Sequence, residues 1–306
     1  MKAAIRKLLK EKNAVLLAHY YQVPEIQELA HFVGDSLALA RKASTTDADM
    51  IVFAGVHFMA ETAKVLNPDK KVLLPDLNAG CSLADSCPAG DFEAFVKDHP
   101  DHVVVTYVNC SAEVKALSDV VCTSGNAVAV INSIPADKPI IFAPDKNLGE
   151  YLIKATGRDM LLWDGACVVH EAFSLDKLLK LRKKHPKAIF IAHPESKEEI
   201  LRIAAYIGST AGMINYVRNS PEQEFIVATE VGILHEMQKV VPEKILIPAP
   251  ATEDNTCACS ECAFMKVNTL EKLYNCLINE YPQVDLDLVI SRKALDPINR
   301  MLSIPA

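Results

Sequence analysis

The sequence lacks the features of several large classes of protein. No apolar run reaches the ~18 residues that a membrane-spanning helix needs. The segment from Met1 to Asn13 has an amphipathic pattern, without the apolar stretch and cleavage site of a signal peptide. Lys and Arg number 32 against 39 Asp and Glu, and the net charge of −7 argues against a surface that binds nucleic acid. We therefore expect a soluble, cytoplasmic protein with neither a membrane nor a nucleic acid as partner.

Two further absences narrow the fold. No Gly-x-Gly-x-x-Gly motif follows any of the first predicted strands, which argues against a nicotinamide dehydrogenase on a Rossmann sheet. No Gly-Ser-rich or Pro-rich linker divides the 306 residues, although this length allows one large domain or two to three small ones. Half of the residues are apolar, so a core of normal size is available.

Cysteine, in contrast, is abundant. A disulfide framework is disfavoured in a reducing compartment, so the nine cysteines need another reason. Metal ligation, redox chemistry and simple burial are the candidates. Burial suits Cys110, Cys122 and Cys276, which lie within otherwise regular segments.

The chain also contains a threefold repeat. Three β-type runs, each followed by a helical pattern, end at a polar tip: His19, Tyr107 and His193. A hydroxyl residue lies 17 positions after each tip, at Ser36, Ser124 and Thr210. A second apolar run ends 35 or 36 positions after each tip, and a third follows about 20 residues later. Chance does not plausibly supply so many matched spacings.

This alternation of β runs and helices predicts an α/β protein with parallel strands and right-handed crossovers. Each repeat reads as a βαβαβ-type, three-layer αβα unit with three strands. We expect the first unit with its N-terminal helix in residues 1–88, the second in 89–172, and the third with a C-terminal helical closure in 173–306. Units of roughly 85 residues bury a poor core alone, so we expect packing around a pseudo-threefold axis with the active site at the centre.

A cysteine stands shortly after each third run: Cys81, Cys167, and the group Cys257, Cys259 and Cys262. The repeat would bring one cysteine of each unit to the axis. Three thiolates can hold a 4Fe–4S cluster whose open iron acts as a Lewis acid, or a zinc ion that keeps a water. The spacing alone leaves cluster and zinc undecided.

The three hydroxyls fall near predicted helix starts at the carboxyl ends of strands. Free N–H groups and the helix dipole favour phosphate or carboxylate at such positions. A lone Ser or Thr there is usually an ordinary N-cap, whereas three in register favour a shared binding site.

Longer motifs resemble the quinolinate synthase family, the iron–sulfur enzymes of NAD biosynthesis. The resemblance covers essentially the whole chain. It rests on AHYYQ (18–22), GDS (34–36), FAGVHFMAETAK (53–64), TYVN (106–109), SGNA (124–127), DGACVVHE (164–171), AHPE (192–195) and GSTAGM (208–213).

The resemblance implies a condensing and dehydrating transferase that joins iminoaspartate to dihydroxyacetone phosphate. Phosphate and two waters leave, and the pyridine ring of quinolinate closes. It assigns a 4Fe–4S cluster to Cys81, Cys167 and Cys262. It implies a substrate pocket lined by His19, Ser36, Tyr107, Asn109, Ser124, His193, Glu195 and Thr210. An aspartate oxidase or dehydrogenase is the implied transient partner that supplies iminoaspartate.

Tyr21 and Glu195 each lie two residues after a strand-tip His and look like the acid–base pair of the family. Tyr107 and His193 are the other catalytic candidates. Glu195 can move protons if partial burial raises its pKa toward neutrality. The alternative is a carboxylate in the first turn of a helix. His170, one helical turn after Cys167, either lies near the cluster or faces solvent.

The third cysteine group departs from the family pattern, which commonly reads C-x-x-C-x-x-C. Here the order is Cys257-x-Cys259-x-x-Cys262, followed by an apolar stretch with Met265. Alignment on that Met favours Cys262 as the ligand, with Cys259 as the substitute. A disulfide within the group would serve redox regulation. The stretch 208–212 is a candidate hinge for a closing loop.

Two alternatives from other classes are a non-enzymatic iron–sulfur redox sensor and a three-thiolate zinc enzyme. A sensor would need the cysteines but would not explain the polar residues at the strand ends. Zinc protein is colourless, whereas cluster protein is brown.

Overall fold

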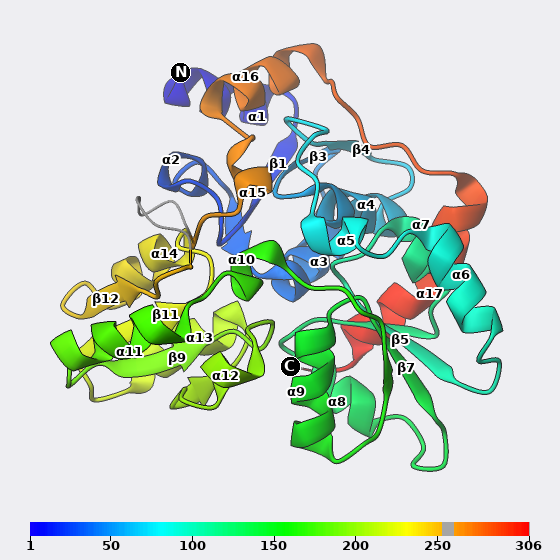
Figure 1. Cartoon of the computed structure of the whole chain (residues 1–306). Helices are drawn as coiled ribbons and strands as arrows, with labels where there is room; N and C mark the ends of the chain where they lie inside the picture. The colour runs from blue at the N-terminus through cyan, green and yellow to red at the C-terminus, as the bar shows by residue number, and fades with distance from the viewer. Residues whose placement is uncertain (253–259, 306) are drawn as a thin grey trace.

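A computed structural model describes residues 1–252 and 260–305. These residues form three parallel four-stranded sheets that alternate with helices (Figure 1). The sheet orders are β2-β1-β3-β4, β6-β5-β7-β8 and β10-β9-β11-β12, so the three sheets share one topology. We call each sheet with its helices a unit.

The first unit contains α1 (Lys2–Glu11), β1 (Ala14–His19), α2 (Pro24–Gln27), β2 (Phe32–Gly34), α3 (Ser36–Ser44), β3 (Met50–Ala54), α4 (His57–Leu66), β4 (Lys71–Leu73) and α5 (Ser82–Asp85). The second contains α6 (Ala89–Lys97), β5 (Val103–Tyr107), α7 (Ala112–Lys115), β6 (Val120–Cys122), α8 (Ala127–Asn132), β7 (Ile140–Ala143), α9 (Lys146–Thr156), β8 (Leu161–Leu162) and α10 (Val168–Glu171).

The third unit contains α11 (Leu175–Lys184), β9 (Ile189–Ala192), α12 (Glu198–Leu201), β10 (Tyr206–Ile207), α13 (Thr210–Asn219), β11 (Glu224–Ala228), α14 (Ile233–Val240), β12 (Ile245–Pro248) and α15 (Ala263–Lys266). The chain then forms α16 (Leu270–Asn279) and α17 (Leu288–Ser303). Within the described ranges, every helix is too short or too polar to cross a lipid bilayer.

The prediction of three strands per unit is wrong, because each sheet has a fourth strand. The stretch predicted as one helix after each strand tip holds a helix of four residues and then a short edge strand: β2, β6 and β10. These edge strands have only two or three residues. So short a strand shows no clear alternation of apolar and polar residues, which is why the sequence pattern conceals it.

The central strands are covered on both faces, as parallel sheets require. Every residue of β1 and β3 is buried. On one face Leu17 joins a cluster with α3 and α4, and on the other Leu16 joins a cluster with α1 and α16. The first sheet therefore lies between two helical layers, which agrees with a three-layer αβα unit.

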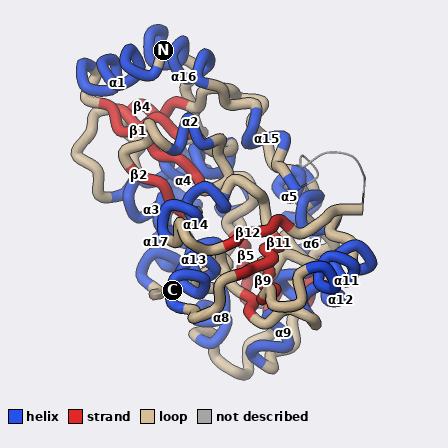
Figure 2. Tube along the Cα trace, turned by 90° about the vertical axis from the view of Figure 1, so that its left-hand side faces the viewer, coloured by secondary structure: helices blue, strands red, loops and turns tan. Residues whose placement is uncertain are grey.

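The two C-terminal helices close the structure. Helix α16 packs beside α1, as Figure 2 shows at the top of the view. Helix α17 contacts α3 and α4 of the first unit and α7 and β6 of the second (Figure 1, red). The side chain of Asn126, which is 1% exposed, donates from Nδ2 to the carbonyl oxygens of Met301 and Ile304. Its Oδ1 accepts the Thr123 N–H. Asn126 thus ties the end of α17 to the second unit.

Substitution Asn126→Ala should lower the free energy of unfolding by about 2–3 kcal/mol, because buried polar groups lose their partners. Urea unfolding of the intact chain measures the change. Ser303→Ala is the control, since its hydroxyl bonds only to the nearby Arg300 carbonyl on the surface. It should change the free energy by less than about 0.5 kcal/mol. Equal effects of the two substitutions would show that Asn126 does not anchor α17.

Candidate active site

One pocket is lined by residues of all three units. Every residue predicted for the site lies on its wall: His19, Tyr21, Ser36, Cys81, Tyr107, Asn109, Ser124, Cys167, His193, Glu195, Thr210 and Cys262. His19 and Tyr107 end β1 and β5, and His193 follows β9 directly. The pocket therefore forms at the carboxyl ends of parallel strands, where loops and helix starts gather.

None of the three hydroxyl residues is a helix N-cap. Ser36 is the first residue of α3, and the N-cap is Asp35, whose side chain accepts the Ala38 N–H at 2.9 Å. Thr210 is the first residue of α13, whose N-cap is Ser209. Ser124 precedes α8, where Asn126 is the N-cap, and its Oγ lies 3.1 Å from His193 Nε2. The N-cap interpretation is wrong at all three positions, and the hydroxyls lie on the pocket wall.

Both carboxylate oxygens of Glu195 have a close polar neighbour, although the residue is only 2% exposed. The Tyr107 hydroxyl donates to Oε1, and His170 Nδ1 lies 2.8 Å from Oε2. Burial by itself would raise the pKa of Glu195, but the two neighbouring imidazoles and the Tyr107 hydroxyl together lower it to about 2. The expected upward shift is therefore wrong, and the residue is held as a carboxylate. It also precedes the first turn of α12, which begins at Glu198.

The series of polar contacts continues beyond Glu195. His170 Nε2 lies 3.0 Å from Thr229 Oγ1, and Thr229 Oγ1 lies 2.6 Å from the Tyr21 hydroxyl. A connected chain thus runs from Tyr107 through Glu195, His170 and Thr229 to Tyr21. His170 is 2% exposed, so the interpretation as a surface imidazole is wrong.

Thr229 is the member of this chain that sequence reasoning missed. It directly follows Ala228, the end of the second apolar run in the third repeat. The equivalent positions hold Gly55 and Pro144. A hydroxyl at one of three equivalent strand ends was the available signal.

The histidines His19 and His193 at the strand tips are neutral, and each forms the same local hydrogen bond with the backbone two residues later. Burial lowers the pKa of His19 and of His193 to about 3 each. The Tyr21 N–H lies 3.2 Å from Nδ1 of His19, and the Glu195 N–H lies 3.5 Å from Nδ1 of His193. Since Nδ1 accepts a backbone proton in both, Nε2 carries the proton of each ring. His193 Nε2–H therefore donates to Ser124 Oγ.

The three predicted ligand cysteines occupy the same local position. Cys81, Cys167 and Cys262 are the N-cap residues of α5, α10 and α15, which are four-residue helices. Burial raises the pKa of the Cys81 thiol to about 12, and it raises those of Cys167 and Cys262 as well. Backbone N–H groups of each following helix oppose these shifts. Buried thiolates favour a cation as partner, so this donor set suits a metal centre.

A second donor set overlaps the first. Cys167, His170 and Glu195 offer ligand atoms that all lie within 4.8 Å of one another. Cys110, Cys122 and Cys276 are buried, as the sequence predicts. Cys257 and Cys259 lie outside the described residues, so the substitute ligand Cys259 and a disulfide in this group stay predictions.

The parallel α/β units and the thiol-lined pocket at the strand ends define the class of this protein: an α/β protein with a candidate metal site. The chain belongs to the family described as "Quinolinate synthetase A protein", whose family model matches residues 3–303. It is 61% identical over 300 residues to a protein named "Quinolinate synthase" of Nostoc sp., which covers 98% of this chain and 92% of the relative. A protein of the same name from Synechococcus sp. is 58% identical over 304 residues, which cover 99% of this chain and 95% of the relative. Another from Thermosynechococcus vestitus is 58% identical over 300 residues, which cover 98% of this chain and 94% of the relative.

The bridging role of Thr229 is testable. Thr229→Val keeps the shape but leaves the Tyr21 hydroxyl and His170 Nε2 without their shared partner. We expect the free energy of unfolding to fall by about 1–3 kcal/mol, measured in urea. Thr62→Val is the matched control, because Thr62 is equally buried but bonds only to the Phe58 carbonyl within its own helix. If the two variants lose the same stability, Thr229 is not the bridge of this network.

Proposed function

We propose that this chain condenses iminoaspartate with dihydroxyacetone phosphate to quinolinate, with loss of phosphate and two waters, as a step in NAD biosynthesis. The observation that carries the proposal is the equivalent placement of one cysteine per unit at the N-cap of a short helix in a single pocket. Membership of the family and the name shared by its relatives support it. An aspartate oxidase or dehydrogenase would supply the iminoaspartate.

Cys81, Cys167 and Cys262 would hold a 4Fe–4S cluster. Bound through three thiolates, such a cluster keeps one iron open, which supplies Lewis-acid chemistry at a substrate oxygen. The common strand order of the sheets and the matching positions of the cysteines support a pseudo-threefold arrangement of the units about this site.

The substrates are anions, and the pocket offers donors for them. Ser36 and Thr210 begin helices, so backbone N–H groups and the positive end of the dipole accompany their hydroxyls. Because Nε2 carries the proton, neutral His19 is a further donor on the pocket wall. These groups would hold carboxylate and phosphate oxygens.

Asn109 adds an acceptor. Its Oδ1 is buried and has no hydrogen-bond partner within the described part of the chain. A buried oxygen without a partner costs free energy, which a bound N–H or O–H group would recover. Asn109 would therefore orient the imine nitrogen or a hydroxyl of a substrate.

The chain of polar contacts provides a route for protons. Glu195 is ionised at neutral pH and would accept a proton from a substrate carbon or nitrogen, and its low pKa favours passing that proton on rather than keeping it. His170 and Thr229 would pass that proton on to Tyr21, which donates its own to a departing hydroxyl. Tyr107 holds Glu195 in place from the second unit.

A zinc enzyme is the second candidate, and one observation favours a zinc ion here, held by one thiolate, one imidazole and one carboxylate instead of three thiolates. Cys167, His170 and Glu195 lie close enough to share one ion, and they combine ligand types that zinc accepts. A redox sensor would use the cysteines but would not require the chain of contacts from Tyr107 to Tyr21.

Metal analysis after purification without oxygen separates these candidates. We expect about four irons and four sulfides per chain. Cys81→Ala, Cys167→Ala and Cys262→Ala should each lose the cluster, since two thiolates hold it poorly. Cys276→Ala is the control, because this cysteine lies on α16, buried where α16 packs against α1. Cys259→Ala should also retain iron. Zinc in place of iron, or no metal, would overturn the cluster assignment.

Glu195→Gln should lower kcat for quinolinate formation by about 10²–10⁴-fold, because the amide cannot accept the proton. Chromatographic detection of quinolinate measures the rate. Iron content should be unchanged, which separates lost proton transfer from lost cluster. Glu198→Gln is the control on the exposed start of α12, where the side chain pairs with Lys154. A Glu195→Gln enzyme with wild-type kcat would contradict the role of this base.

A further inference from the structure

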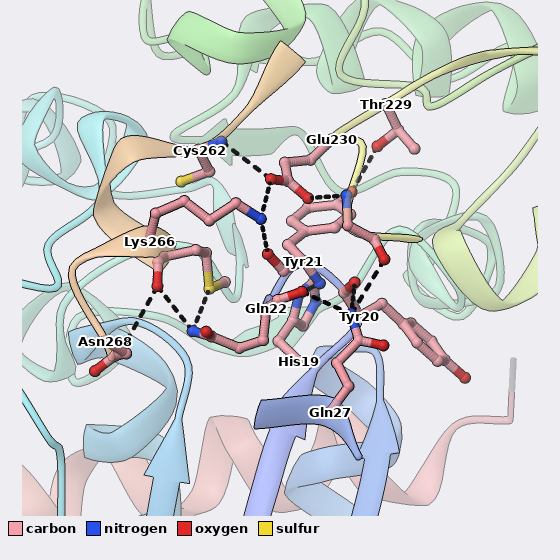
Figure 3. Close-up of polar contacts among 12 residues, drawn as sticks. His19, Tyr20, Tyr21, Gln22, Gln27, Thr229, Glu230, Cys262, Lys266 and Asn268 are labelled. Atoms are coloured by element: carbon pink, nitrogen blue, oxygen red, sulfur yellow. Dashed lines mark hydrogen bonds and ion pairs between the residues drawn. The ribbon is translucent and has the colours of Figure 1, made fainter. Parts of the chain in front are cut away.

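A largely buried ion pair lies beside Cys262, outside the set of residues that the sequence singled out (Figure 3). Lys266 Nζ is 2.8 Å from Glu230 Oε1, and the side chains of Glu230 and Lys266 are 1% and 19% exposed. A buried pair of charges repays its desolvation only when the geometry is good and the remaining donors and acceptors are satisfied. The pair next to the pocket is therefore stable only if the neighbouring groups satisfy both charges.

The pair is fully engaged with the backbone of three chain segments. Glu230 Oε1 also accepts the N–H of Cys262 at 3.2 Å, and Oε2 accepts the N–H of Gly232 at 2.7 Å. Lys266 Nζ donates to the carbonyl oxygen of Tyr21 at 2.6 Å. The loop after β1, the loop after β11 and the start of α15 thus meet at one carboxylate and one ammonium group (Figure 3).

Neighbouring contacts tighten the same junction. Gln22 Nε2 donates to the Met265 carbonyl at 2.9 Å (Figure 3). Asn268 Nδ2 donates to the Gly55 carbonyl at 2.8 Å. A Cβ atom at Gly232 would lie 2.8 Å from the Tyr21 carbonyl oxygen, so only glycine permits this approach. The segment that carries Cys262 is therefore packed directly against the loop that carries Tyr21.

Cys262 needs such a tether more than its two counterparts do. Cys81 and Cys167 follow the last residues of β4 and β8 by 8 and 5 positions, whereas Cys262 follows β12 by 14. Helix α15 has only four residues, so it is not stable as an isolated helix and depends on its tertiary contacts.

We propose that Glu230 and Lys266 are positioning residues that fix Cys262 relative to Tyr21. The pair thereby fixes the position of the Cys262 thiol in the third unit relative to the loop after β1 in the first unit, which carries Tyr21. The proposal rests on the proposed function in so far as Cys262 is a cluster ligand, but the placement of the thiol can be tested without any metal.

The test is differential alkylation of the cluster-free full chain without oxygen. Iodoacetamide labelling is followed over time by peptide mass spectrometry at Cys262, Cys81 and Cys167 in wild type, Lys266→Met and Glu230→Gln. We expect Cys262 to react about tenfold faster in Lys266→Met, which corresponds to about 1.4 kcal/mol of lost restraint. Cys81 and Cys167 should react at the wild-type rate. Removing the Lys266 charge alone would raise the pKa of the Cys262 thiol and slow the reaction, so faster labelling reports movement.

Lys244→Met is the matched control. Lys244 is buried and, like Lys266, donates to main-chain carbonyl oxygens, here those of Val217 and Ser220, away from the pocket. It should lower the melting temperature without changing the labelling of Cys262. Glu230→Gln keeps the size of the side chain and serves if Lys266→Met does not fold. Because removal of the Glu230 charge lowers the pKa of the Cys262 thiol and speeds labelling by itself, this variant is judged by iron retention.

Iron retention gives an independent measurement. In the reconstituted holoenzyme, iron loss to a chelator should be about tenfold faster in the two variants than in wild type or Lys244→Met. Unchanged labelling of Cys262, or equal acceleration at all three cysteines, would overturn the positioning role. If wild type itself binds no iron, the proposed function fails, while the labelling still decides whether the pair positions Cys262.

Discussion

The buried carboxylate of Glu195 is the point on which the pocket depends. An ionised group this far from water is costly unless its neighbours compensate it. The compensation comes from the Tyr107 hydroxyl of the second unit and from His170, which follows the second sheet. The loops after separate sheets must therefore be in place together, because any one of them alone would leave a buried charge without its partners. The chain of contacts onward to Thr229 and Tyr21 extends this dependence to the first unit.

The same desolvation leaves the pocket histidines without their second proton and the pocket thiols with theirs, so both kinds of group are uncharged. It keeps His19 and His193 neutral, with pKa values lowered to about 3, and it raises the pKa of the three pocket cysteines. A bound cation would reverse the preference of the thiols, since metal ligation requires thiolate. The pocket thus combines one fixed carboxylate, neutral donors and thiols that suit a metal, which is the combination that the proposed reaction needs.

Much of the candidate site could be predicted because polar strand ends, hydroxyl residues and cysteines recur at matching positions in the three repeats. His19, Tyr107 and His193 stand at equivalent strand ends, and parallel strands of one topology bring equivalent ends to equivalent places. The spacing of Ser36, Ser124 and Thr210 follows from the same repeat. The edge strands β2, β6 and β10 escaped prediction because two or three residues carry no readable period. Thr229 and the pair of Glu230 and Lys266 escaped it because each acts across units and has no counterpart in the other repeats.

The sequence by itself determined the three-unit α/β architecture, the polar strand ends, the cysteines and the family. Those features are local or periodic, so hydrophobic patterning and motif spacing encode them directly. Only the tertiary structure decided the charge of Glu195, the tautomers of His19 and His193, and the partners of His170. The physical reason is that a pKa and a hydrogen bond depend on which groups from distant parts of the chain share a buried space, and no spacing along the sequence specifies that.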